Sequence, residues 1–144
     1  MAEFIFKDMV KKQHLEKQFL IASAATSTEE IWNGTGNPVY PQARQELRRH
    51  GLSCEGKRAT LLVREDYQRY DFLLGMERWN ISNMMKILRS DPDGKVSRLL
   101  DFSDHPRDIA DPWYTGEFGT TYDDIVEGCE AFLKYLKENG YVNV

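Results

Sequence analysis

The chain has 144 residues, of which 41% are hydrophobic and 29% are charged, and its formal net charge is -4. This composition excludes an intrinsically disordered chain, and the length suits one domain, residues 1–144. The acidic balance argues against a nucleic-acid partner, because proteins that bind nucleic acids usually present a basic surface.

The sequence shows no signal for membrane insertion or for secretion. No apolar run approaches the roughly 20 residues that span a bilayer, and the first residues lack the basic and then apolar pattern of a signal peptide. The two cysteines, Cys54 and Cys129, make no disulfide framework. We therefore expect a cytoplasmic protein with no membrane partner.

Apolar spacing and turn residues predict the elements of the first half of the chain. Pro41 suits the first turn of a helix and Gly51 suits its end. The predicted elements are a helix over 1–12, a strand over 18–24, a loop rich in Thr, Asn and Gly over 26–37, a helix over 41–50 and a short helix over 64–70.

The second half continues the alternation of apolar segments and amphipathic helices. Asn80 is a predicted N-cap, and the last helix has the clearest helical period of the chain. The predicted elements are a strand over 72–76, a helix over 80–88, a strand over 96–100, a polar loop over 101–119, a helix over 122–138 and a strand-like tail over 141–144.

This order of elements predicts an α/β fold with a largely parallel sheet covered on both faces. Ligands of such sheets bind beyond the carboxyl ends of the strands. Only three good strands are present, which makes a thin sheet.

Metal and cofactor motifs are absent from the sequence. The three histidines, His14, His50 and His105, have no ligand spacing, and no Cys-x-x-Cys occurs. Asn33 to Gly36 lacks the Gly-Lys-Ser/Thr ending of a phosphate loop, and no dinucleotide fingerprint is present. We expect neither a metal nor a cofactor.

Neither cysteine fits a phosphatase nucleophile, which needs an arginine six residues later. Thr60 follows Cys54 at that distance and Tyr135 follows Cys129. Cys129 lies on the apolar stripe of the last helix and is interpreted as a core residue.

The segment Asp111-Pro112-Trp113-Tyr114 is the strongest chemical signal. Proline biases the preceding aspartate toward an extended backbone. An acid beside aromatic walls suits a flat aryl substrate whose leaving oxygen must be protonated, with Trp32 as a third wall. The alternative is a capped turn whose two aromatic residues lie on the core.

Seven motifs in the same order make the chain resemble the low-molecular-weight protein-tyrosine-phosphatase family over nearly its whole length. Asp-Pro-Trp-Tyr followed by an amphipathic helix is the most specific of them. The motifs are Met1-Ala2-Glu3, Ser23-Ala24-Ala25-Thr26-Ser27, Gly36-Asn37-Pro38, His50-Gly51, Arg64-Glu65-Asp66-Tyr67, Gly75-Met76-Glu77-Arg78-Trp79-Asn80 and Asp111-Pro112-Trp113-Tyr114.

The resemblance implies a three-layer, parallel-sheet phosphotyrosine phosphatase I-like fold and metal-free hydrolysis through a cysteinyl-phosphate intermediate. It implies that Asp111 resembles the general acid and base, and that Trp113 and Tyr114 resemble the aromatic pocket wall. Trp32 resembles the aromatic residue facing them, and Ser23 resembles the serine that braces the phosphate loop through hydrogen bonds.

The chain departs from the family at its start. The family has its first strand, which is central in the sheet, and the loop Cys-x-x-x-x-x-Arg-Ser-Pro immediately before Met-Ala-Glu, and here Met1 is that methionine. We expect a chain that starts at an internal methionine, lacks the first strand, and is catalytically inactive. A smaller departure is Lys57 to Val63, where the family usually has a His, an Ala-Arg pair and a Thr.

A vacant central position in the sheet would leave backbone groups unpaired, each costing on the order of 1–3 kcal/mol. We therefore expect a substitute strand, with the tail over 141–144 as the candidate, or association as a homo-oligomer or strand swap. A frayed terminus is the alternative for the tail.

Two classes of function stay open for the chain. The first is a tyrosine phosphatase whose partner is a phosphotyrosine protein or a small aryl phosphate. The second is a non-catalytic binding module that keeps the aromatic pocket. Arsenate reductases with this fold need further cysteines around the middle helix, and 71–90 contains none.

Overall fold

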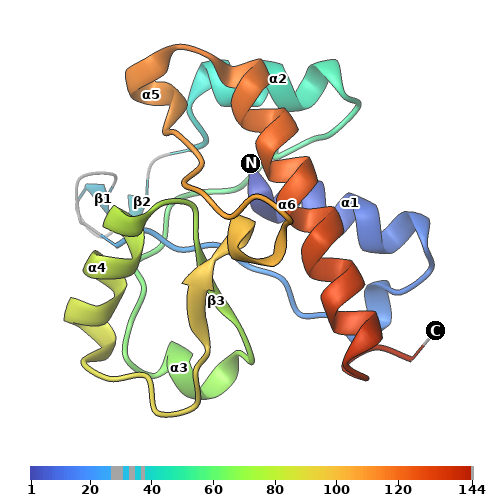
Figure 1. The fold of residues 1–144 in the computed structure, drawn as a ribbon. Coiled ribbons are helices and arrows are strands. Elements are labelled where there is room, and N and C mark those ends of the chain that lie inside the picture. The colour runs from blue at the N-terminus through green and yellow to red at the C-terminus, as the bar shows by residue number, and fades with distance from the viewer. Residues whose placement is uncertain (27–30, 33–34, 37, 144) are drawn as a thin grey trace.

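The structure, a computed structural model, describes residues 1–26, 31–32, 35–36 and 38–143. Figure 1 shows α1 (Ala2–Lys12) and α6 (Phe118–Glu138) on one side of a short sheet and α4 (Arg78–Leu88) on the other. The helices are α1 Ala2–Lys12, α2 Pro41–Arg49, α3 Asp66–Arg69, α4 Arg78–Leu88, α5 Pro112–Thr115 and α6 Phe118–Glu138. The strands are β1 Ile31–Trp32, β2 Thr35–Gly36, β3 Leu73–Gly75 and β4 Val96–Arg98.

A parallel pair of strands forms the centre of the molecule, which confirms the expected α/β class. β3 pairs with β4, with Leu74 opposite Ser97, and α4 makes the crossover between them. The other pair, β1 and β2, is antiparallel and lies in the region predicted as a loop.

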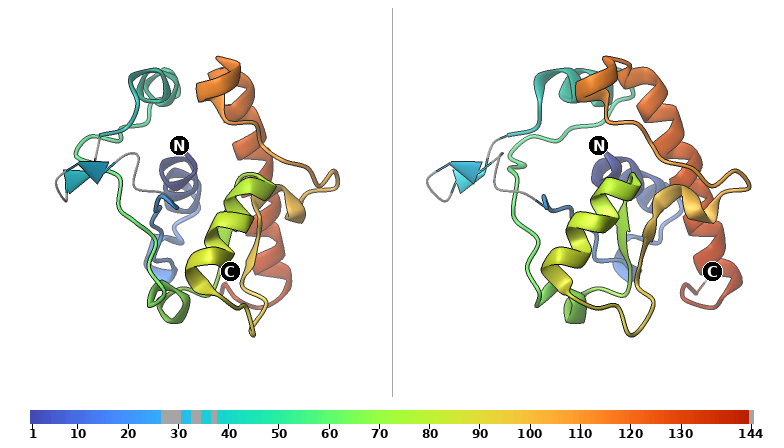
Figure 2. Two further views of the ribbon diagram at one scale, coloured as in Figure 1. Left: turned by 90° about the vertical axis from the view of Figure 1, so that its left-hand side faces the viewer. Right: turned by 60° about the vertical axis from the view of Figure 1, so that its left-hand side comes forward.

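Successive residues of β3 enter different layers, as strand geometry requires. Leu73 belongs to a core with Met84 and Leu88 of α4. Leu74 packs against a larger core that includes buried residues of α1 and α6. Figure 2 shows α4 on one side of β3 and α1 on the other, so the sheet lies between two helical layers.

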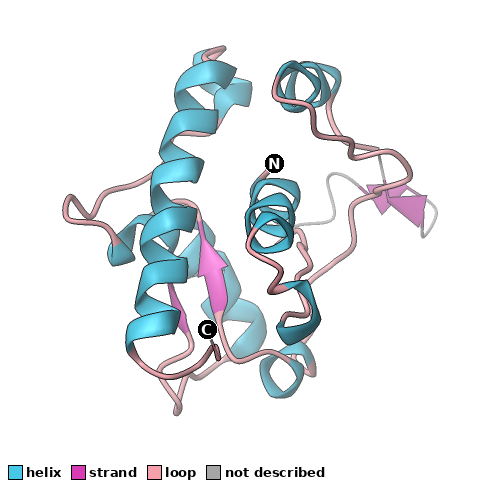
Figure 3. Cartoon of the chain, turned by 90° about the vertical axis from the view of Figure 1, so that its right-hand side faces the viewer, coloured by secondary structure: helices cyan, strands magenta, loops and turns pink. Residues whose placement is uncertain are grey.

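α6 is the helix that organises the larger core. Its buried residues recur at helical spacing, and Figure 3 shows it beside α1 across one face of the sheet. Gly128 allows α6 to approach the 3₁₀ turn Leu99–Phe102, because a Cβ there would lie 2.6 Å from Leu99 Cγ.

The prediction of a strand over 18–24 is wrong. Residues 19–24 join no strand ladder in the described part of the chain, and Ala25 makes an isolated parallel bridge with Leu61. Phe19 instead packs edge-on against Phe6, with ring centroids 5.4 Å apart. The apolar run signals burial, and contact with α1 provides that burial without a ladder.

The strand-like tail over 141–144 is also not a strand in residues 141–143, and Val144 lies outside the described residues. Val142 is buried, and the Gln18 side chain exchanges two 2.9 Å hydrogen bonds with the backbone of Asn143. The described tail therefore closes against the 3₁₀ turn Glu16–Gln18 that follows α1, and it does not pair with β3. The expected association between copies stays a prediction.

Two helix boundaries differ from the prediction. Asn80 is the third residue of α4 and not its cap: its side-chain oxygen accepts hydrogen bonds from the N–H groups of Met76 and Glu77 at 3.0 and 3.1 Å. The loop predicted over 101–119 contains α5 and the start of α6, because Pro112 begins a helical turn.

Candidate functional site

Asp111 lies at the entrance to α5. Its carbonyl accepts hydrogen bonds from the N–H groups of Tyr114 and Thr115, at 3.1 and 3.3 Å, which closes the helical turn. The Asp111 side chain is exposed, and Tyr114 is 84% exposed. The alternative interpretation, a turn whose aromatic residues lie on the core, holds for the backbone turn. It does not hold for Tyr114, whose side chain faces solvent.

Two neutral contacts hold the backbone just before Asp111. The N–H of Ile109 donates to the carbonyl of Met76 at 2.9 Å, and the Ile109 side chain is only 1% exposed. The hydroxyl of Thr121, on α6, donates to the carbonyl of Ala110 at 3.1 Å. These contacts fix the loop to Met76, directly after β3, on one side and to α6 on the other, so the core determines the position of the Asp111 backbone.

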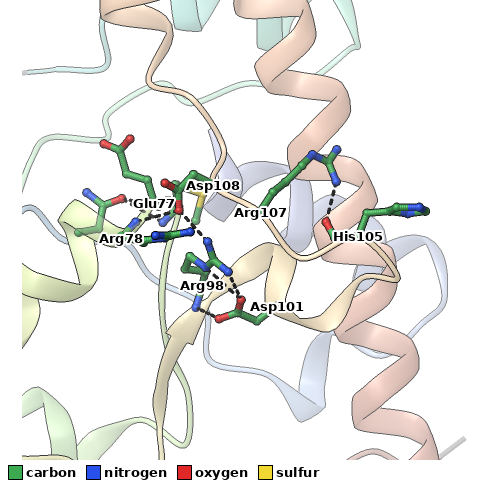
Figure 4. Close-up of polar contacts among 9 residues, drawn as sticks. Glu77, Arg78, Arg98, Asp101, His105, Arg107 and Asp108 are labelled. Atoms are coloured by element: carbon green, nitrogen blue, oxygen red, sulfur yellow. Dashed lines mark hydrogen bonds and ion pairs between the residues drawn. The ribbon is translucent and has the colours of Figure 1, made fainter.

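Ion pairs reinforce the same loop, as Figure 4 shows for Arg98 and Asp108. The guanidinium of Arg98 lies 2.9 Å from Asp108 and 2.8 Å from Asp101. The hydrogen bond from Arg98 holds the pKa of Asp108 below its ordinary value.

Arg107 anchors the loop to α6. Its guanidinium lies 2.9 Å from Glu127 and 3.0 Å from Asp124, and it also donates to the carbonyl of His105 at 2.9 Å. The hydrogen bond with Glu127 raises the pKa of Arg107, so the cation persists at every physiological pH. Sequence analysis missed this anchor because its partners are about twenty residues away.

Glu77, at the start of α4, is an acidic neighbour of Asp111 that sequence analysis did not single out. Burial raises the pKa of Glu77, and the negative charges of Asp111 and Asp108 raise it further. Glu77 lies within the motif Gly75-Met76-Glu77-Arg78-Trp79-Asn80, and that motif is the one sequence signal that could have identified it. The described site therefore gathers three carboxyl groups near the end of β3.

Ser23 lies in a different polar cluster, at the start of α1. Its hydroxyl donates to Glu3 at 2.7 Å, and its carbonyl accepts from Lys57 and Thr60 at 3.3 Å. Lys57 Nζ also lies 2.8 Å from Glu3 Oε1. Burial alone would raise the pKa of Glu3, but hydrogen bonds from Lys57, Lys7 and Ser23 lower it to about 2.

This cluster predicts a pH-dependent contribution to stability. The Glu3 side chain is 5% exposed, so Glu3→Gln should lower the free energy of unfolding by on the order of 1–3 kcal/mol at pH 7. A depressed carboxyl pKa stabilises the fold above the unfolded pKa, near 4.5, and that stabilisation is lost as the pH falls toward about 2. Urea denaturation between pH 7 and pH 2.5 measures this difference.

The matched control is Asp8→Asn, which removes the more exposed pair of Asp8 with Lys12 at 2.8 Å. We expect that change to stay within about 0.5 kcal/mol at every pH. Equal effects of Glu3→Gln and Asp8→Asn at pH 7 would contradict the role of the buried carboxylate.

The remaining predicted pocket residues are placed by their backbone. Trp32 belongs to β1, opposite Thr35, and Trp113 belongs to α5. The side chains of both tryptophans lie outside the described part of the structure. Their convergence with Tyr114 therefore stays a prediction.

Both cysteines are buried in the larger core, Cys54 at 5% and Cys129 at 1% exposure. Burial raises the pKa of the Cys129 thiol to about 12, which keeps it protonated and unreactive. Across the described residues, no three His, Cys, Asp or Glu side chains gather as a metal site. The same described residues include no helix long and apolar enough to cross a membrane.

Comparison with known proteins identifies a family that the chain matches over nearly its whole length. The sequence profile of the family described as "Low molecular weight phosphotyrosine protein phosphatase" matches residues 1–142. The low molecular weight protein-tyrosine-phosphatase YfkJ of Bacillus subtilis is 31% identical over 140 residues, covering 96% of this chain and 87% of the relative. The low molecular weight phosphotyrosine protein phosphatase of Gallus gallus is 32% identical over 138 residues, covering 92% and 84%.

The fold comparison gives the same result. The crystal structure of YfkJ from Bacillus subtilis superposes with a TM-score of 0.88 at 29% identity, covering 96% of this chain and 86% of that one. This likeness confirms the three-layer, parallel-sheet phosphatase fold that the motifs implied.

Proposed function

The chain belongs to the low molecular weight phosphotyrosine protein phosphatase family, and from this premise we propose that Asp111 is the general acid and base of phosphotyrosine hydrolysis. In that chemistry a cysteine thiolate attacks phosphorus, so that an S–P bond forms while the P–O bond to the phenol breaks. Asp111 would donate its proton to the departing phenol oxygen. It would then accept a proton from the water that hydrolyses the cysteinyl phosphate.

The position of Asp111 supports this role. The carboxyl group is exposed, as an acid that meets an incoming substrate must be, while its backbone is fixed through Ile109 and Thr121. Exposed Tyr114 follows one turn later and offers a flat wall for the phenol ring. We further propose that Trp32 and Trp113 complete this wall and that Ser23 braces the anion-binding part of the site.

We propose that the 144-residue chain alone does not turn over phosphate esters. The observation that carries this proposal is the state of its thiols: both are buried, and neither is followed by arginine at the sixth position. General acid catalysis alone supplies about 10²–10⁴-fold and does not replace covalent attack and stabilisation of the transition-state charge. The substrate class would be a phosphotyrosine protein or an aryl phosphate in the cytoplasm.

The second candidate is a binding module of one domain that recognises an aryl group or a peptide without chemistry. The 84% exposure of Tyr114 favours it, because an aromatic side chain so exposed is available to a partner. Such a module would bind its partner through the aromatic surface and would not need proton transfer by Asp111.

Titration of the chain with a phosphotyrosine peptide and with its unphosphorylated twin separates the two candidates. The variant Tyr114→Ala, compared with Tyr40→Ala on another exposed aromatic residue, restricts the result to the proposed site. A phosphate-dependent preference that Tyr114→Ala reduces supports the phosphatase site. Equal binding of the two peptides, again reduced by Tyr114→Ala, supports the binding module and contradicts the first proposal.

A further inference from the structure

A hollow of about 470 Å³ lies against α2, on the side formed by the turn that follows this helix. Neither Asp111 nor Tyr114 lines it. Its walls include Arg44 and Arg48 of α2, the segment from Gly51 to Lys57, and Pro38 with Val39.

Two guanidinium groups give this hollow its charge. Arg44 and Arg48 stand one helical turn apart and therefore share a face of α2. Within the part of the chain that the structure describes, neither guanidinium group has a hydrogen-bond or ion-pair partner. Arg49, on the neighbouring face, pairs with Glu46 at 3.2 Å. Glu55 is the single acidic residue in the described lining.

The chain as a whole carries a net charge of -4, so a pair of unpaired guanidiniums beside a hollow is a local reversal of sign. Lys57 adds a third positive charge to the same lining, although its ammonium is already paired with Glu3 at 2.8 Å. A concave surface with one sign of charge concentrates ligands of the opposite sign.

The lining of the hollow also includes apolar residues. Val39 and Leu52 are half-buried aliphatic residues of the lining. Gly51 and Gly56 both have positive φ, 78° and 83°, and a Cβ at either would meet nothing within 4 Å among the residues that the structure describes. The hollow therefore has room beside the cations for a substituent the size of a phenyl ring.

We propose that this hollow binds a phosphate monoester, with the phosphate between Arg44 and Arg48 and its apolar substituent against Val39 and Leu52. Arginine matches phosphate because its planar fork of N–H groups donates two parallel hydrogen bonds. The proposal concerns binding alone and involves none of the residues assigned to hydrolysis.

Isothermal titration of the chain with phenyl phosphate and with inorganic phosphate tests the proposal. We expect phenyl phosphate to bind more tightly than inorganic phosphate. The double variant Arg44→Gln/Arg48→Gln should weaken phenyl phosphate by at least about tenfold, since it removes both charge-assisted donors. The control Arg64→Gln removes an exposed arginine outside the hollow and should leave binding unchanged. Affinity should rise as the pH passes about 6, where the ester becomes a dianion.

A double variant that binds phenyl phosphate as the unmodified chain does would overturn the proposal, and so would the absence of binding to the unmodified chain. Binding that Tyr114→Ala abolishes and the double variant retains would place the phosphate at the site proposed for hydrolysis instead. The two proposals can therefore fail separately.

The same titration distinguishes a phosphorylated protein segment from a small phosphate ester as the ligand of the hollow. A phosphotyrosine peptide that binds at least tenfold more tightly than phenyl phosphate, with loss in the double variant, supports the site and identifies a protein segment as its ligand. Equal affinities with the same loss support the site and identify a small phosphate ester. A peptide unaffected by the double variant contradicts a protein ligand at this hollow.

Discussion

Replacing Asp111 by asparagine should lower kcat by about 10²–10⁴-fold once the chain is supplied with a nucleophile. The test uses an N-terminal extension that carries a strand and Cys-x-x-x-x-x-Arg-Ser-Pro before Met1, following the pattern of the family. Asparagine keeps the size of the side chain and cannot donate a proton to the leaving oxygen. Steady-state hydrolysis by the extended chain and its variant measures the loss.

The leaving group makes this prediction specific to acid catalysis. Phenol is a poorer leaving group than p-nitrophenol and needs its proton more. The loss of kcat/KM, which reports the step that breaks the P–O bond, should therefore be larger for phenyl phosphate than for p-nitrophenyl phosphate. Asp104→Asn, an exposed acid in the same loop, serves as the matched control and should leave kcat within about twofold. Equal losses of kcat/KM for the two substrates would contradict the role of Asp111 as the acid.

Gly128→Val should lower the free energy of unfolding by about 3 kcal/mol, the upper part of the range for overpacked cores. A Cβ at Gly128 would lie 2.6 Å from Leu99 Cγ and 3.4 Å from Leu100 Cδ2. Both leucines are buried, at 3% and 0% exposure, so neither side chain can move aside freely. Urea denaturation followed by circular dichroism measures the change.

Gly119→Ala in the same helix is the control for this prediction. Among the described side chains, a Cβ at Gly119 would meet only Glu46 Oε1, at 3.8 Å, which is an ordinary contact. We expect a neutral change or a stabilisation of up to about 1 kcal/mol, because alanine favours helix over glycine. Similar destabilisation by the two substitutions would show that the contact of α6 with Leu99 is not as close as the structure has it.

Helical periodicity carried most of the fold prediction. α1 and α6 were identifiable because their apolar residues recur along one face. α2 was identifiable from Pro41 at its start and from Gly51 just after its end, where the backbone has a positive φ of 78°. The segment over 18–24 was misassigned because an apolar run reports burial and cannot report a pairing partner. Phe19 satisfies that burial on Phe6.

The site was predictable only where a local motif encoded it. Asp111 and Tyr114 were found through four adjacent residues. The groups that hold them were not found, because Arg107 reaches Asp124 and Glu127 across seventeen and twenty residues. Arg44 and Arg48 were likewise unremarkable in the sequence, and the hollow beside them exists only in the folded chain.

Hydrolysis of p-nitrophenyl phosphate by the unextended 144-residue chain tests the proposal that these residues include the acid of the reaction and no nucleophile for it. We expect no turnover above the rate of the Asp111→Asn variant, and no change with Cys54→Ser or Cys129→Ser. Turnover that Asp111→Asn abolishes would contradict it, because a nucleophile would then have to exist among the residues present.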